Sequence, residues 1–378
     1  MASRLTAPTF VTMATNHREA FSLASFVTPS SIGWTAMRLA LPLLLILLSG
    51  CTGSELLRDD DDAANDDDAA NDDADTNPPG PLRLDEVQAR CTHNSYHVEP
   101  ALPFDASHRY THAPLDVQLE DQGVRGFELD LHLNGDEELA VFHLPIIDAE
   151  STCDLFVDCL QTIKDWSDAN PLHHPIFVWL ELKDDVDINK IDDYDQLDED
   201  IRSVFPPERL LEPDDVQGAW SSLREALTEE GWPLIDTIRG QTMFLLLEGG
   251  EHVVDYTEDY TTLAGKPIFV QGGTDRFDTP IAAVSKINNA GDVDAIAQAV
   301  SRRIITASNI GGAGESDDEN AAHLATALLS GTNMLCDDFP APVDGRKYWM
   351  DTPDGTPSRC NPVRASDECT SEGLEDLP

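Results

Sequence analysis

Basic residues are scarce in this sequence of 378 residues. It contains 24 lysines and arginines against 71 aspartates and glutamates, which gives a formal net charge of −47 at neutral pH. A surface this negative repels nucleic-acid phosphates and so argues against nucleic acid as a partner. It repels anionic lipid headgroups for the same reason, so that contact with a membrane would require a bound cation or a covalent anchor.

The longest apolar run is too short to be a membrane span. Leu39–Leu48 has instead the length of the apolar core of an export signal, and it ends in Leu48-Ser49-Gly50-Cys51. This ending resembles the lipobox of bacterial lipoproteins. We therefore expect residues 1–51 to be a signal segment that starts at Met37 or Met13, with a plain secretory signal as the alternative.

The lipobox resemblance implies that Cys51 is lipidated and begins the mature chain. Acyl chains on this cysteine would hold the protein to a membrane without a transmembrane helix. The following residue is Thr52 and not the aspartate that retains many lipoproteins in the inner membrane. We expect an exported lipoprotein of the cell envelope, at the outer membrane or the cell surface.

Large apolar residues are absent from residues 58–81, which contain ten aspartates. Such a segment cannot bury enough surface to fold, and its charges keep it extended. Calcium-binding loops are the alternative, but the glycine and the terminal glutamate of an EF-hand loop are missing. We expect residues 52–81 to be a disordered tether. The catalytic domain would then cover 82–378, with a C-terminal cap from about 341.

Strand-like apolar runs alternate with amphipathic helical segments from about residue 82 to 340. This alternation is typical of a parallel β/α fold, and about eight strands favour a TIM-type (β/α)8 barrel over an open sheet. A glycine-rich phosphate loop after the first strand is missing, which argues against a nucleotide-binding fold. The expected strands are 87–92, 124–131, 139–143, 176–182, 242–247, 267–271, 303–307 and 332–336. The clearest expected helices are 154–167, 216–230 and 319–330.

Six cysteines follow Cys51, and zinc-type CxxC spacing is absent. An even number in an exported chain favours disulfides, although fifteen connectivities are possible. We expect the local pairs Cys153–Cys159 and Cys360–Cys369. The last strand of a barrel is the neighbour of the first, which would place Cys336 beside Cys91 and predicts a third bridge.

Polar residues end several of these strands, where barrel enzymes carry their active sites. Glu128 and Asp130 are two apart and share a face, Glu181 ends a later strand, and Asn94 follows the first. Four oxygen donors suit calcium or, as the alternative, magnesium. Histidines would also suit zinc, but two of them are needed for proton transfer.

Two histidines at strand ends, His93 and His143, predict general acid–base chemistry beside this cation. A phosphodiester fits, because one histidine can take the proton of an attacking hydroxyl while the other protonates the leaving alkoxide. Lys183, two residues after Glu181, would help to offset the phosphoryl charge.

Five stretches resemble, in order and spacing, the bacterial calcium-dependent phosphatidylinositol-specific phospholipase C family of TIM-barrel phosphodiesterases. They read THNSY, GVRGFELDLH, FHLP, WSDANPLHHPIFVWLELK and GWPLIDTIRGQTMFLLL, and the similarity extends to TNMLCDDFPAP and RCNP. The resemblance implies that His93 and His143 are the catalytic pair and that Lys183 binds substrate. It implies calcium ligation by Asn94, Glu128, Asp130 and Glu181.

The resemblance implies cleavage of phosphatidylinositol-type lipids to diacylglycerol and a cyclic inositol phosphate. We expect the enzyme to be a monomer. Two alternatives stay open. One is a glycerophosphodiester phosphodiesterase on the same barrel and metal. The other is a noncatalytic surface lipoprotein that binds calcium or sugar.

Overall fold

The computed structural model describes residues 81–183, 194–249, 251–353, 357–371 and 374–375. The expected signal segment, 1–51, and residues 52–80 of the expected tether lie outside the described residues. Among the helices that are described, none is long and apolar enough to cross a bilayer.

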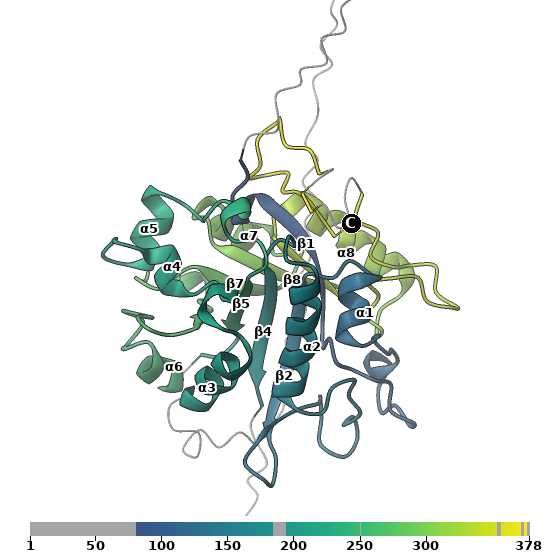
Figure 1. Cartoon of the computed structure of the whole chain (residues 1–378). Coiled ribbons are helices and arrows are strands. Elements are labelled where there is room, and N and C mark those ends of the chain that lie inside the picture. Colours follow the sequence, from purple (N-terminus) through teal and green to yellow (C-terminus); the bar gives the residue numbers. More distant parts are fainter. Residues whose placement is uncertain (1–80, 184–193, 250, 354–356, 372–373, 376–378) are drawn as a thin grey trace, which may run out of the picture. The chain divides into compact units, whose positions relative to one another are not determined.

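Eight parallel strands form a nearly closed barrel with helices on its outside (Figure 1), in the order β6-β5-β4-β2-β1-β9-β8-β7. An isolated bridge between Gln271 and Val284 links β6 to β7. The expected TIM-type barrel is confirmed. Its strands are β1 (Val87–Thr92), β2 (Gly126–Leu133), β4 (Ile176–Leu182), β5 (Thr242–Leu246), β6 (Ile268–Val270), β7 (Val284–Asn289), β8 (Ile305–Gly311) and β9 (Met334–Asp337).

Local sequence explains where α8 begins and ends. In α8 the side chain of Ser316 accepts from the Glu319 N–H while Glu319 accepts from the Ser316 N–H, a capping box, and Gly331 ends the helix at a φ of +85°. The helices are α1 (Leu115–Glu120), α2 (Phe156–Ala169), α3 (Asp195–Val204), α4 (Pro213–Gln217), α5 (Leu223–Glu229), α6 (Glu251–Tyr256), α7 (Val293–Ser301) and α8 (Asp317–Ser330).

One helix prediction was wrong in its continuity. The expected helix 216–230 is two helices, α4 and α5, because Gly218 adopts a φ of +54° at the end of α4. A residue with positive φ cannot continue a right-handed helix.

One expected barrel strand, 139–143, is not part of the barrel. Its residues Leu139–Val141 form β3, which pairs antiparallel with the end of β2. Only five residues, 134–138, separate the two strands, and a crossover to a parallel neighbour needs a dozen or more. The helical crossover from β2 leads through α2 to β4 instead.

The barrel strand that the sequence did not reveal is β7, Val284–Asn289. Its sequence, VSKINN, has no continuous apolar run, since Lys286 and Asn288 line a cavity at the barrel mouth. A strand whose inward side chains serve a polar site loses the hydrophobic signal by which buried strands are detected.

All three expected disulfides are present: Cys91–Cys336, Cys153–Cys159 and Cys360–Cys369. Cys91 and Cys336 are register partners on β1 and β9. On the other side of β1, Cys91 faces Gly126 of β2. A Cβ at Gly126 would lie 2.8 Å from that of Cys91, so the glycine provides room for the bridge. A short strand in the C-terminal segment, β10 (Ser358–Cys360), pairs antiparallel with β1.

The Cys91–Cys336 bridge is predicted to stabilise the fold strongly, because it closes a separation of 245 residues. The double variant Cys91→Ala/Cys336→Ala should lose about 2–4 kcal/mol of unfolding free energy, measured by denaturant titration. The matched control, Cys360→Ala/Cys369→Ala, removes a bridge over 9 residues and should lose less. Equal losses would contradict the loop-length argument.

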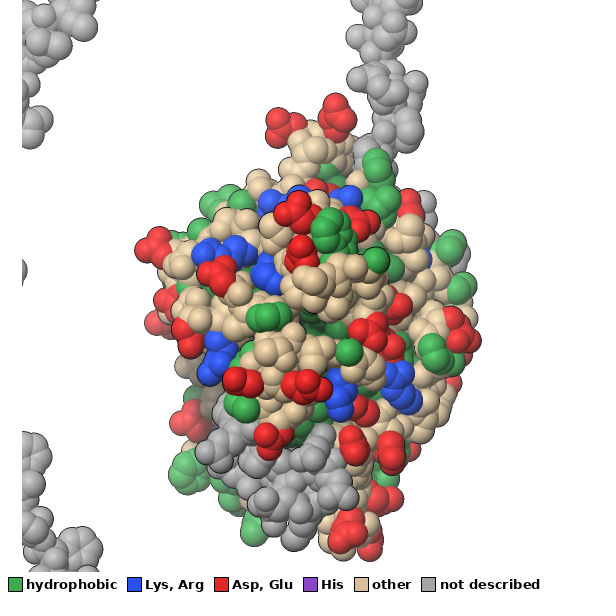
Figure 2. Space-filling model, turned by 90° about the vertical axis from the view of Figure 1, so that its left-hand side faces the viewer, with side chains coloured by type: hydrophobic (Ala, Val, Ile, Leu, Met, Phe, Trp, Pro, Cys, Tyr) green, Lys and Arg blue, Asp and Glu red, His purple; other side chains and the backbone are tan. Residues whose placement is uncertain are grey.

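Acidic side chains are spread over the face that carries α4 to α6, with lysine and arginine between them (Figure 2). This face offers no broad basic surface for a nucleic acid.

Candidate active site

Three carboxylates converge at the barrel mouth. Glu128 and Asp130 extend from β2 and Glu181 from β4, where Asp130 and Glu181 are register partners. One carboxylate oxygen from each lies within 4.8 Å of the others. The alternation of a strand places residues 128 and 130 on the same face, and parallel pairing brings the end of β4 beside them.

Two lysines offset this negative charge. Lys183 Nζ lies 2.8 Å from Asp130 and 2.7 Å from Glu181, and Lys286 of β7 forms a buried ion pair with Glu128 Oε1. Burial raises the pKa of Asp130. Burial alone would also raise the pKa of Glu128, but the charge and hydrogen bond of Lys286 together with the charges of His93 and Lys183 outweigh it, and the pKa falls.

Buried oxygen at this cluster is left without a partner. Glu128 Oε2 makes no hydrogen bond to any described residue, and such an atom is costly unless a cation or a donor compensates it. Asn94 is buried at a φ of +43°, and the residue after it, Ser95, donates its N–H to the Glu128 carbonyl at 2.9 Å. These residues fit a hard divalent cation.

His93 follows β1 and pairs with Asp338, which follows β9. Its Nδ1 lies 2.9 Å from Asp338 Oδ1, and the other carboxylate oxygen accepts from the Ala313 N–H at 2.8 Å. This contact fixes the proton on Nδ1 and leaves Nε2 for proton transfer. Burial would lower the pKa of His93, but the hydrogen bond and charge of Asp338 and the charge of Glu128 raise it to about 8.

His93 lies where two open cavities meet. One, of about 450 Å³, is lined by Glu128, Glu181 and Lys286 as well. The other, of about 440 Å³, extends past Asp338 along the chain that follows β8. Both include His93, Asn288 and Asn309, so they form one groove of a size suited to a small-molecule headgroup.

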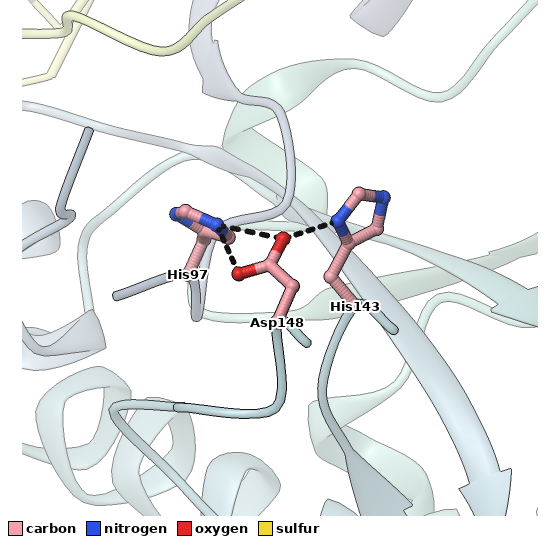
Figure 3. Close-up of side chains that lie close together, drawn as sticks. All are labelled: His97, His143 and Asp148. Atoms are coloured by element: carbon pink, nitrogen blue, oxygen red, sulfur yellow. Dashed lines mark hydrogen bonds and ion pairs between the residues drawn. The ribbon is translucent and has the colours of Figure 1, made fainter. Parts of the chain in front are cut away.

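His143 is held in a second cluster (Figure 3). It follows β3 and not a barrel strand, which corrects the position expected from the sequence, and it is not among the residues that line the two cavities. Its Nδ1 lies 2.6 Å from Asp148, a fully buried carboxylate that also contacts His97 and His108. As in His93, an aspartate binds Nδ1, and Nε2 is the nitrogen available for proton transfer.

Three important site residues were missed from the sequence: Asp148, Asp338 and Lys286. Asp338 had a visible signal, because it comes directly after the last strand, in CDDFP. Asp148 lies in a loop, where the Leu144 and Asp148 backbones bond to each other, and Lys286 lies on the undetected strand. The sequence around Asp148 and around Lys286 has no pattern that indicates a role in the site.

Residues 136–362 match the family model described as phosphoinositide phospholipase C, Ca2+-dependent. The chain belongs to this family. Among solved structures, it is similar to a calcium-dependent phosphatidylinositol-specific phospholipase C from Streptomyces antibioticus, with 19% identity and a TM-score of 0.53, over 68% of this chain and 95% of that one. A calcium-dependent phosphoinositol-specific phospholipase C from a Pseudomonas species, in an apo form, has 20% identity and a TM-score of 0.50, over 70% and 93%. These two likenesses show the fold. No curated protein matches the sequence significantly.

For a member of a calcium-dependent family, the carboxylate cluster is the place that suits the ion. Its donors are oxygen atoms, and Glu128 Oε2 is buried there without a hydrogen bond from the described chain. The histidine cluster around Asp148 is richer in nitrogen and has a different metal preference.

Proposed function

We propose that this protein is a calcium-dependent phosphodiesterase that cleaves phosphatidylinositol-type lipids to diacylglycerol and a cyclic inositol phosphate. The observation that carries the proposal is the placement of His93. Its Nδ1 is held by Asp338 while its ring borders the cavity lined by Glu128 and Glu181. A proton-transfer group and a cation site therefore face the same space.

The two histidines would divide the proton transfers. One accepts the proton of the inositol 2-hydroxyl as that oxygen bonds to phosphorus, and the bond from phosphorus to the diacylglycerol oxygen breaks. The other donates a proton to the departing oxygen. The carboxylates of Asp338 and Asp148 keep Nδ1 of His93 and His143 protonated, so that each Nε2 is the exchanging atom.

Calcium would be held by Asn94, Glu128, Asp130 and Glu181. When bound, it supplies positive charge that stabilises the phosphoryl oxygens and lowers the pKa of the attacking hydroxyl. Lys286 lines the same cavity, and Lys183 is paired with Asp130 and Glu181. Both ammonium groups are within the site and can contact phosphate or inositol hydroxyls.

Exposed apolar side chains near His143 support a lipid substrate. Leu102 and Phe104 are 88% and 83% exposed on one loop, and Ile146 is 97% exposed on another. The two loops meet where His108 contacts Asp148. Ile146 has a φ of +72°, which a β-branched residue rarely adopts, and strained backbone of this kind often marks a functional loop.

Export supports the same substrate. Three disulfides fit an oxidising compartment. We propose that lipidated Cys51 anchors a monomer at the cell envelope, where bilayer lipid is within reach.

The function is tested by incubating tag-free protein with mixed vesicles of defined headgroup and following the products by phosphorus NMR. We expect cyclic inositol phosphate from phosphatidylinositol, loss of turnover in EGTA, and recovery with added calcium but not magnesium. Glycerol phosphate from a glycerophosphodiester would support the alternative phosphodiesterase. Calcium binding without turnover of any headgroup would support the noncatalytic lipoprotein. Undiminished turnover in EGTA would refute the mechanism.

A further inference from the structure

Three imidazoles surround one buried carboxylate beside the proposed active site. Asp148 lies 2.6 Å from His143 Nδ1, 3.0 Å from His97 Nε2 and 3.3 Å from His108 Nδ1. Figure 3 shows Asp148 between His97 and His143. One potential ligand atom from each of these three residues lies within 4.8 Å of the others.

One close contact in this cluster, between His97 and Asp148, has no hydrogen atom to make it a hydrogen bond. His97 Nδ1 lies 3.0 Å from the Tyr110 carbonyl, which can only accept, so Nδ1 carries the hydrogen. In a neutral ring, Nε2 then presents a lone pair toward Asp148 oxygens at 3.0 and 3.2 Å. Two lone pairs at this distance require a proton or a cation between them.

His108 adds a second unexplained nitrogen. The residue is 7% exposed, and its Nδ1 makes no hydrogen bond to any described residue although it faces Asp148. A buried polar atom without a partner is rare in folded proteins. His143 already directs its own Nδ1 at the same carboxylate oxygen, so hydrogen bonding to Asp148 leaves His108 unsatisfied.

We infer that His97, His143 and Asp148, whose donor atoms already lie together, form a binding site for a zinc-type divalent cation, with His108, whose Nδ1 lies 3.3 Å from Asp148, moving in as the fourth ligand. Three imidazole nitrogens and one carboxylate oxygen are a zinc donor set, whereas calcium prefers the oxygen-only cluster of Glu128, Asp130 and Glu181. His97 is also prepared as a ligand, because its other ring nitrogen is fixed by a backbone carbonyl, as is usual for metal-binding histidines. Its ring is stacked on Tyr110 with centroids 4.1 Å apart.

Zinc in this site would inhibit the enzyme, a consequence that rests on the proposed function. The ion would replace the proton on His143 Nδ1 and engage Asp148. Proton exchange at His143 Nε2 depends on the hydrogen bond from Nδ1 to Asp148. With the ion in place of that hydrogen bond, His143 could no longer act as an acid or a base. Binding of the ion itself does not depend on any activity.

The site is tested with Co²⁺ as a spectroscopic probe of tag-free protein in saturating calcium. We expect one equivalent to bind with the intense visible bands of tetrahedral coordination, and zinc to displace it. His97→Ala and His108→Ala should each weaken binding at least about 10-fold. Two controls should leave binding unchanged: His323→Ala, which removes a partly exposed histidine paired with Glu315, and Glu128→Gln, which alters the oxygen cluster.

Absence of saturable cobalt binding would overturn the inference, as would binding that persists in both histidine variants or is lost in Glu128→Gln. Circular dichroism and thermal melting check that each variant is folded, and His108→Gln replaces any alanine variant that is not. If cobalt binds as described but no phosphodiester is cleaved, the metal site stands and the proposed function fails. If the enzyme is active and binds cobalt in this way, micromolar zinc should inhibit wild type and not His108→Gln.

Discussion

Replacing His93 with alanine is expected to lower kcat for phosphatidylinositol cleavage by about 10²- to 10⁴-fold, the usual contribution of a general acid or base. His93 borders both cavities at the barrel mouth, and its orientation is set by Asp338. Calcium affinity, measured by calorimetry, should stay near the wild-type value, because the carboxylate ligands remain. A variant with full activity would remove His93 from the mechanism.

Asp338→Asn distinguishes the two roles that His93 could have. The Asp338 hydrogen bond and charge oppose the effect of burial and raise the pKa of His93 to about 8. The Asp338→Asn variant replaces this carboxylate with a neutral amide, so the pKa of His93 should fall. If His93 is the base, it must be neutral to act, and the acidic limb of the pH–activity profile will move to lower pH. If it is the acid, the alkaline limb will move to lower pH instead. A merely structural role for Asp338 would reduce activity without moving either limb.

The second large effect is expected at the ion pair between Lys286 and Glu128. Their side chains are 8% and 3% exposed, so removal of either partner leaves a buried charge without compensation. Without calcium, Lys286→Met and Glu128→Gln should each lose about 3–5 kcal/mol of unfolding free energy. Denaturant titration in EGTA measures this loss.

Calcium should separate these two variants. In Lys286→Met all the proposed ligands remain, and an ion at 100 times its Kd should restore about 2.7 kcal/mol. In Glu128→Gln one ligand is lost, and calcium should restore little. Glu229→Gln, an exposed carboxylate on α5, is the control for net charge and should behave as wild type. Equal rescue of both variants would exclude Glu128 as a ligand.

The carboxylate cluster was predictable because its rule is local. A strand alternates its side chains, so Glu128 and Asp130 had to share a face wherever β2 was placed. The end of a neighbouring parallel strand had to lie at the same edge, which brought Glu181 to them. The reasoning failed for residues 139–143, where an apolar run after a five-residue turn was taken for a barrel strand.

Asp338 and Lys286 were not predictable by such a rule. Asp338 is 245 residues from His93, and Lys286 is 158 residues from Glu128. Aspartates and lysines are mostly solvated in any sequence, and this chain has 71 acidic residues. Only burial in the folded chain distinguishes the few that belong to the site from the many on the surface.

The amino-acid sequence by itself determined the barrel, its Cys91–Cys336 bridge and the oxygen donors at its mouth, because period-two alternation and the adjacency of first and last strands hold for every closed parallel barrel. Tertiary structure alone decided that Asp338 binds His93, that Asp148 gathers three histidines and that Lys286 neutralises Glu128. The first and the last of these contacts join segments far apart in the sequence, and the second brings His97 to a loop that lies 51 residues further along the chain. They form because packing buries Asp338, Asp148, Glu128 and Lys286, and a buried charge is costly without a partner.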